Sequence, residues 1–197
     1  DFRDFLRTEL AEPAGLPALR FGVRPEDVDT VAHGYFLGDK AVQIASFTVG
    51  REVERLTTDP QMATALIPGA GLVSDAGTLA AFYEMLVRGG VGMSGERLLQ
   101  QETVTRYTDR HVRGWDHTTS APIALGRGFF TGSMTPSLYG YWGTRDCFGH
   151  AGMFCTVGFA DQGTGVAAAI VTNGNRSKSD LVRRMLPLCS GIRSACR

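Results

Sequence analysis

One short stretch of the chain, from Cys147 to Cys155, brings together residue types that could do chemistry. His150 lies between Gly149 and Gly152, and glycines let the backbone approach a ligand closely because they have no Cβ. An imidazole at such a place can donate a proton, accept one, or act as a cation toward a bound molecule. A structural zinc site normally needs four ligands in paired short spacings, which this stretch does not provide. The residues indicate substrate contact, and a histidine hydrogen-bonded at a strand end is the simpler alternative.

A second group of such residues lies in and just before residues 111–120, which we expect to form a polar loop. Asp109, His111, Asp116 and His117 are types that bind metals. A solvated loop explains them more simply, because polar side chains concentrate in surface connections. The sequence therefore predicts no metal site and no cofactor.

The four cysteines leave the redox compartment open. On an unbroken helix the Cα atoms of Cys189 and Cys196 would lie about 10 Å apart, too far for a disulfide. They could pair only if the helix ended near Gly191. Cys147 and Cys155 could pair across neighbouring strands, whereas free buried thiols are the usual state in cytosolic proteins.

Strands predicted between residues 147 and 173 would position the histidine. The first strand ends near His150, and a half-alternating strand follows it. A tight turn is expected at residues 162–165, because Gly163 and Gly165 favour a hairpin connection. Residues 166–171 are all apolar, which is typical of a strand buried on both faces.

Helices are predicted before and after these strands. Helical periodicity is found in residues 1–10, 76–88 and 102–107, and again from about Asp180, with an interruption or kink near Pro187. Ser74 and Asp75 are expected to cap the helix of residues 76–88. Residues 124–130 are expected to form one further strand.

Composition excludes several classes of partner. Twenty acidic and twenty basic residues cancel, so no net charge favours nucleic acid or an anionic membrane. No apolar stretch approaches the ~20 residues that a membrane-spanning helix needs. The chain starts as if inside a helix, without a methionine or a cap, which suggests that an upstream segment is missing.

Three stretches together resemble the serine β-lactamase and penicillin-binding-protein superfamily, and most closely its class C β-lactamase-related esterases and D-peptidases. They are residues 67–90 (IPGAGLVSDAGTLAAFYEMLVRGG), residues 95–104 (GERLLQQETV), and FGHAG at residues 148–152 with its hairpin and residues 166–173. In that family the strand that corresponds to residues 148–152 carries Lys-Thr-Gly or His-x-Gly along one wall of the active site. The resemblance covers nearly the whole chain.

The resemblance implies an α/β fold of the α+β type, incomplete in this chain. Its parts would be an antiparallel sheet with a flanking C-terminal helix, and a mostly helical lobe. Residues 1–120 would belong to the lobe, and residues 121–197 to the sheet strands and the final helix, both within one β-lactamase-like domain.

The chain departs from the family at its nucleophile. Family members use a serine in Ser-x-x-Lys, whose lysine helps to activate it. No serine of this chain has a lysine three residues later, and Tyr-x-Asn or Ser-x-Asn is also absent. Ser74 is interpreted as a helix cap because no base lies near it in the sequence.

The resemblance also assigns roles to residues of the strand. His150 would orient a substrate carboxylate or stabilise charge on the leaving group, and the backbone N–H of Met153 would complete an oxyanion hole. Gly152 would let substrate lie against the strand. Phe154, Tyr141 and Trp142 would line a site for an apolar acyl group, or form a minor core.

These roles imply the C-terminal part of a serine hydrolase whose nucleophile lies outside this chain. Its substrates would be small esters, β-lactams or D-amino-acid amides, with esterase preferred because histidine replaces the lysine of Lys-Thr-Gly. An upstream segment or a separate N-terminal chain would supply the serine. The alternative is a non-catalytic, truncated β-lactamase-like module that binds partners or acts as a scaffold.

Overall fold

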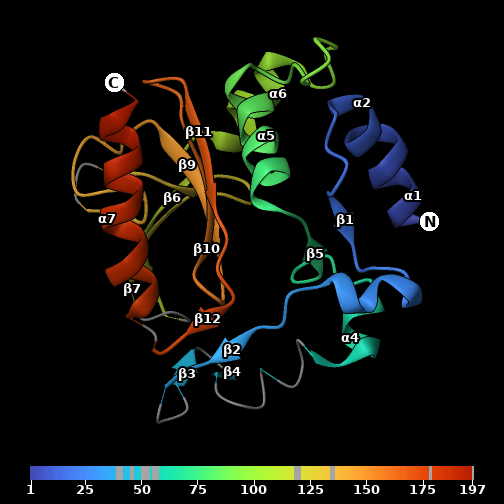
Figure 1. Ribbon diagram of the computed structural model, residues 1–197. Helices are drawn as coiled ribbons and strands as arrows, with labels where there is room; N and C mark the ends of the chain where they lie inside the picture. Colours follow the sequence, from blue (N-terminus) through green and yellow to red (C-terminus); the bar gives the residue numbers. More distant parts are fainter. Residues whose placement is uncertain are drawn as a thin grey trace.

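An antiparallel sheet of six strands forms the centre of the molecule (Figure 1), and its strands follow the spatial order β11-β10-β9-β8-β7-β6. The computed structural model describes residues 1–38, 42–44, 47–49, 54, 58–117, 121–133, 136–177 and 179–196, with backbone alone for 42–44 and 47–49. The strands of the sheet are β6 (Val112–Asp116), β7 (Ala121–Leu125), β8 (Phe130–Thr131), β9 (Cys147–Gly152), β10 (Thr156–Asp161) and β11 (Val166–Ile170).

Two helices cover opposite faces of the sheet, α5 (Ala76–Val87) on one side and α7 (Asp180–Ala195) on the other (Figure 1). Successive strand residues point to opposite faces, so each strand contributes to two cores. Phe148 and Ala160 join the core beneath α5, whereas Val157 and Phe159 pack with Met185 of α7. The sheet is therefore buried on both sides where β9 and β10 run.

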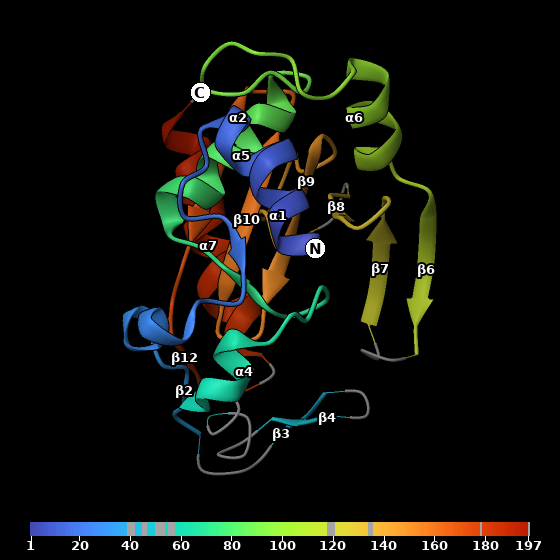
Figure 2. The same cartoon turned by 90° about the vertical axis from the view of Figure 1, so that its right-hand side faces the viewer.

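The remaining elements form a mostly helical lobe with short strands, shown from another side in Figure 2. Its helical elements are α1 (Phe2–Leu6), the π-helical η1 (Arg7–Ala11), α2 (Glu12–Ala14), the 3-10 helix η2 (Pro25–Thr30), α4 (Pro60–Thr64) and α6 (Gln101–Thr108). Its short strands are β1 (Arg20–Phe21), β2 (Tyr35–Phe36), β3 (Val42–Ile44), β4 (Phe47–Val49) and β5 (Leu72–Val73). β1 pairs with β5, and β2 pairs in parallel with β12 (Gly174–Asn175), which joins this lobe to the chain before α7.

The predicted strands between residues 147 and 173 are confirmed as β9, β10 and β11. β11 is the edge strand and is mostly half-buried, so the expectation of a strand buried on both faces was wrong. The β10–β11 turn contains Gly165 at φ 73°, a left-handed conformation that glycine adopts without a Cβ penalty. The helices predicted at residues 76–88 and 102–107 are confirmed as α5 and α6. Asp75 is the N-cap of α5, and its carboxylate accepts from the Thr78 N–H at 2.7 Å, so the cap is Asp75 rather than Ser74.

Two expectations within residues 111–130 were wrong. Residues 112–116 form β6, paired with β7, instead of a polar loop; residues 118–120 lie outside the described residues. The predicted strand at 124–130 is divided into the end of β7 and the start of β8, because Gly128 takes φ 86° and turns the chain. Polar, exposed strands such as β6 lack the apolar alternation by which sequence patterns reveal a strand.

Two prolines lie inside helical segments, and one of them, Pro187, was expected to interrupt or kink its helix. Pro187 lies inside α7, which continues to Ala195, and Pro187 is exposed, so its missing N–H is lost on the solvent side. Pro13 follows the π-helical turn η1, and the helical segment ends only at Gly15, where φ is 71°. Pro13 has no N–H for the i→i−4 hydrogen bond of an α-helix. The π-helical turn before it uses i→i−5 bonds instead, so that missing bond is not needed there.

Candidate active site

His150 is exposed near the end of β9, on the face of the sheet that α5 covers. Its Nδ1 atom lies 2.9 Å from the carbonyl oxygen of Ala151, and its ring centroid lies 4.9 Å from that of Phe130. A carbonyl oxygen can only accept, so in this contact Nδ1 acts as the donor. Nε2 is the ring nitrogen left to contact solvent or a ligand.

The backbone at His150 is held by close packing of α5 on the sheet. Gly158 pairs with His150 across the strands, and a Cβ at Gly158 would lie 2.2 Å from a ring carbon of Tyr83. Burial raises the pKa of Tyr83 well above its usual value, and a hydrogen bond to the backbone of His150 partly opposes this shift. The phenol therefore stays neutral and anchors the strand beneath the histidine.

A three-residue turn, residues 153–155, links β9 to β10 directly after the histidine strand. Cys155 takes φ 59°, the one non-glycine residue with positive φ among the described residues. Hairpin loops of this length commonly place a residue in the left-handed region, which costs a non-glycine side chain of the order of 1 kcal/mol. Complete burial of the Cys155 side chain holds that conformation in place.

Side chains from the segment after β11 bind the carbonyl groups of this turn. Asn175 Nδ2 donates to the carbonyl of Met153 at 2.8 Å, and the hydroxyl of Thr172 contacts the carbonyls of Phe154 and Cys155. Asn175 is only 4% exposed, and its Oδ1 accepts from the Ser177 N–H at 3.0 Å. The Met153 carbonyl therefore has its own side-chain donor, and the carbonyls of Phe154 and Cys155 share the single hydroxyl proton of Thr172. The sequence interpretation saw Asn175 only as part of a formal glycosylation sequon.

Met153 exposes its side chain, and no acceptor for its backbone N–H is found among the described residues. Phe154 is half-buried and packs on Gly34, where a Cβ would come within 2.5 Å of the Phe154 ring. Gly34 precedes β2, so the lobe contacts the tip of the β9–β10 hairpin. Phe154 is thereby committed at least partly to packing.

Tyr141 and Trp142 lie at a different end of the sheet from the turn. The Tyr141 N–H donates to Ser190 Oγ, and Arg193 donates to the carbonyl of Trp142. Both partners belong to the last part of α7, about 15 Å along the helix from Asp180, where the segment carrying Asn175 ends. The structure brings together His150, Gly152, Met153 and Phe154 but not these two aromatic residues.

Potential metal ligands, long helices and cysteines can each be located in the part of the chain that is described. No group of three or more His, Cys, Asp or Glu side chains suited to a metal occurs there. No helix found there is long and apolar enough to cross a bilayer. All four cysteines are free, because Cys147 and Cys155 sit at opposite ends of their hairpin and α7 remains helical between Cys189 and Cys196.

The antiparallel sheet, its C-terminal helix and the helical lobe define a β-lactamase-like fold. A model of the β-lactamase family matches residues 1–189, so the chain belongs to that family. It is 27% identical to the esterase/beta-lactamase LipL of Mycobacterium tuberculosis, over 88% of this chain and 43% of LipL.

Solved structures give the same fold. A penicillin-binding protein homolog from Caulobacter crescentus is 26% identical with a TM-score of 0.77, over 99% of this chain and 52% of that one. EstA from Arthrobacter nitroguajacolicus is 22% identical with a TM-score of 0.77, over 98% of this chain and 53% of that one. The chain thus spans about half the length of these relatives.

Proposed function

We propose that this chain supplies one wall of the active site of a β-lactamase-like serine hydrolase with esterase activity. The observation that carries the proposal is the end of β9, where an exposed His150 is followed by an N–H at Met153 with no acceptor among the described residues. These groups match the family's His-x-Gly strand and its oxyanion donor. LipL, whose name includes both esterase and β-lactamase, supports the same reaction class.

In this proposal a serine outside the chain attacks the carbonyl carbon of a small ester, and negative charge develops on the carbonyl oxygen. The Met153 N–H would donate to that oxygen, and one such donor contributes roughly 3 kcal/mol to transition-state stabilisation. Nε2 of His150 would contact the leaving side of the substrate or, when protonated, a substrate carboxylate. Gly152 would leave room for the acyl group, with Phe154 at its edge. The acyl-enzyme would then be hydrolysed by water.

The first test replaces His150 with alanine in the complete protein that contains this chain. We expect turnover of a p-nitrophenyl ester to fall at least tenfold, while the circular dichroism spectrum and melting temperature stay unchanged. His111→Ala is the matched control, because the exposed His111 side chain contacts the Arg106 carbonyl at 2.8 Å and lies outside the proposed site. Unchanged turnover in His150→Ala would remove the histidine from the proposal.

A second test locates the nucleophile and separates the hydrolase from a non-catalytic binding or scaffold module. Intact mass is measured after treatment with a serine-reactive phosphonate, once for this 21.2 kDa chain and once for the complete protein. We expect an adduct on the complete protein and none on this chain. An adduct on neither would favour the module, which the absence of Ser-x-x-Lys suggests.

A further inference from the structure

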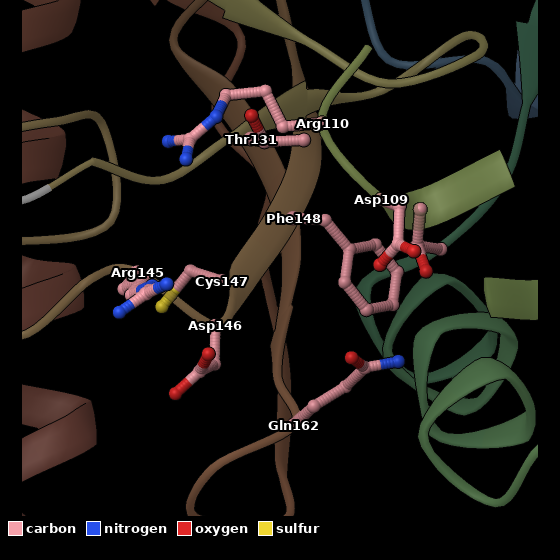
Figure 3. A pocket seen from close by; sticks show the side chains of 9 residues that line it. Asp109, Arg110, Thr131, Arg145, Asp146, Cys147, Phe148 and Gln162 are labelled. Atoms are coloured by element: carbon pink, nitrogen blue, oxygen red, sulfur yellow. The ribbon is translucent and has the colours of Figure 1, made fainter. Parts of the chain in front are cut away.

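A polar cavity of about 180 Å³ lies beyond the start of β9, at the opposite end of the strand from Gly152 and Met153 (Figure 3). It is open to solvent and is lined by the loop after α6, the end of β8, the start of β9 and the β10–β11 turn. Its polar lining includes Asp109, Arg110, Thr131, Arg145, Asp146 and Gln162. A cavity measured with a water-sized probe needs about 10–15 Å³ to hold one water molecule, so this one has room for a small ligand.

The floor of the cavity contains a buried hydroxyl without a partner. Thr131 is 8% exposed, and its Oγ1 has no hydrogen-bond partner among the described residues. Thr131 pairs with Phe148 across β8 and β9, so the strands hold its backbone in place. Buried polar groups are nearly always hydrogen-bonded, and an unsatisfied one costs about 1–3 kcal/mol. A buried hydroxyl that lines a cavity and lacks a partner can form a hydrogen bond with a ligand bound there.

Four charged side chains line the same cavity without pairing. Arg110 and Arg145 provide two guanidinium groups, and Asp109 and Asp146 provide two carboxylates, so the formal charges cancel. No nitrogen of these arginines lies within 4.0 Å of a carboxylate oxygen in the described structure. Figure 3 shows Arg145 and Asp146 on one side of the cavity and Asp109 on the other.

We propose that this cavity binds a small zwitterion that carries a carboxylate and an ammonium group, of which a free α-amino acid is the simplest kind. The guanidinium groups of Arg110 and Arg145 and the hydroxyl of Thr131 donate to the ligand carboxylate. Asp109 and Asp146 accept from its ammonium group, and the amide of Gln162 can bond either end. Charge-assisted hydrogen bonds of this type are about twice as strong as neutral ones.

The balance of charge separates this ligand from simpler ones. A plain anion would be attracted by the two arginines but repelled by the two carboxylates. A plain cation would be attracted by the carboxylates but repelled by the arginines. Only a molecule with both charges places each group beside its complement. The site is independent of the proposed hydrolysis, because it contains neither His150 nor the turn that follows it.

Binding can be measured by ¹⁵N–¹H NMR titration of this chain with glycine, acetate and methylamine. We expect glycine to give saturable shifts at the amides of Thr131, Asp146 and Gln162, with an affinity at least tenfold higher than that of either half-molecule. Equal affinity for acetate and glycine would show an anion site and overturn the zwitterion. No saturable shift with any probe would overturn the site.

Variants test which groups bind the ligand. Arg145→Gln and Asp146→Asn should each weaken the binding of glycine at least fivefold. Asp146→Asn should leave the affinity for acetate unchanged or raise it. Both side chains are exposed, so the fold should persist. Arg183→Gln is the control, because Arg183 is exposed on α7 away from the cavity. Glycine binding that Arg145→Gln and Asp146→Asn leave unchanged would overturn the assignment.

Discussion

Burial makes three of the cysteines packing residues rather than nucleophiles. Cys147, Cys155 and Cys189 are almost inaccessible, whereas Cys196 is exposed. Burial raises the pKa of each buried thiol, that of Cys189 to about 11, and the carboxylate of Asp161 raises the pKa of Cys147 further. Since the thiolate is the reactive form, these side chains should resist alkylation.

We therefore predict that iodoacetamide at pH 8 modifies Cys196 at least tenfold faster than the other three cysteines. Intact mass against time should show one fast addition, which Cys196→Ser abolishes. Rapid modification of several sites in the folded protein would contradict this burial.

The same shifts predict a loss of stability in alkali. The folded state keeps Cys189 protonated, whereas an unfolded thiol ionises near pH 8.5, so ionisation favours unfolding. This contribution is complete below that pH and is lost as pH rises toward about 11. Denaturant midpoints that stayed constant from pH 8 to 11 would contradict this predicted loss of stability. The pH dependence of the midpoint should be compared with that of the Cys189→Ala variant.

At the scale of elements, the β9–β10 turn depends on the segment after β11. Asn175 donates to the Met153 carbonyl, and the Thr172 hydroxyl is shared between the carbonyls of Phe154 and Cys155. The Thr156 hydroxyl donates back to the Thr172 carbonyl at 3.3 Å. The β2–β12 pair places this segment next to Gly34, which contacts Phe154. The turn geometry is thus determined by residues about twenty positions later in the chain.

Removal of the Asn175 side chain should loosen the turn. Asn175→Ala leaves the Met153 carbonyl and the Ser177 N–H without their partners, which should cost about 1–3 kcal/mol of unfolding free energy. If the Met153 N–H acts on the transition state, the complete enzyme should lose kcat at least fivefold while KM changes little. Asn173→Ala is the control, because Asn173 is exposed and uses its backbone carbonyl to bond Tyr35. Equal effects of both variants would argue against a positioning role.

For the whole molecule, a buried ion pair connects the sheet to α7. Arg193 Nε donates to Asp161 Oδ2 at 2.6 Å, both side chains are 3% exposed, and the same guanidinium binds the carbonyls of Trp142 and Gly143. The Gly163 N–H donates to the other Asp161 oxygen at 3.1 Å. One arginine therefore joins β10, α7 and the loop before β9.

Replacement of that arginine should be costly. Arg193→Met leaves Asp161 charged and buried without its partner, and loss of one member of a buried pair typically costs about 3–5 kcal/mol. Urea denaturation should show this loss, whereas Arg183→Met at an exposed position should change stability by at most about 0.5 kcal/mol. Adding Asp161→Asn to Arg193→Met should recover part of the loss, and a double variant less stable than the single one would contradict the pairing.

The sequence alone determined the elements with strong local signals. The glycine turn before β11, the apolar face of α5 and the His-Ala-Gly strand were all predicted, as was membership of the β-lactamase family. Apolar periodicity and turn chemistry act over a few neighbouring residues, so they can be read along the chain. These signals also located His150 at the exposed end of β9.

The tertiary structure decided which distant residues meet. It separated Tyr141 and Trp142 from His150, because both are attached to the end of α7. It showed Asn175 and Gly34 as supports of the turn, and it brought Thr131 and four charged side chains around one cavity. Such contacts join strands, loops and helices far apart in sequence, and no local pattern records them, since they arise only when the sheet is assembled and packed.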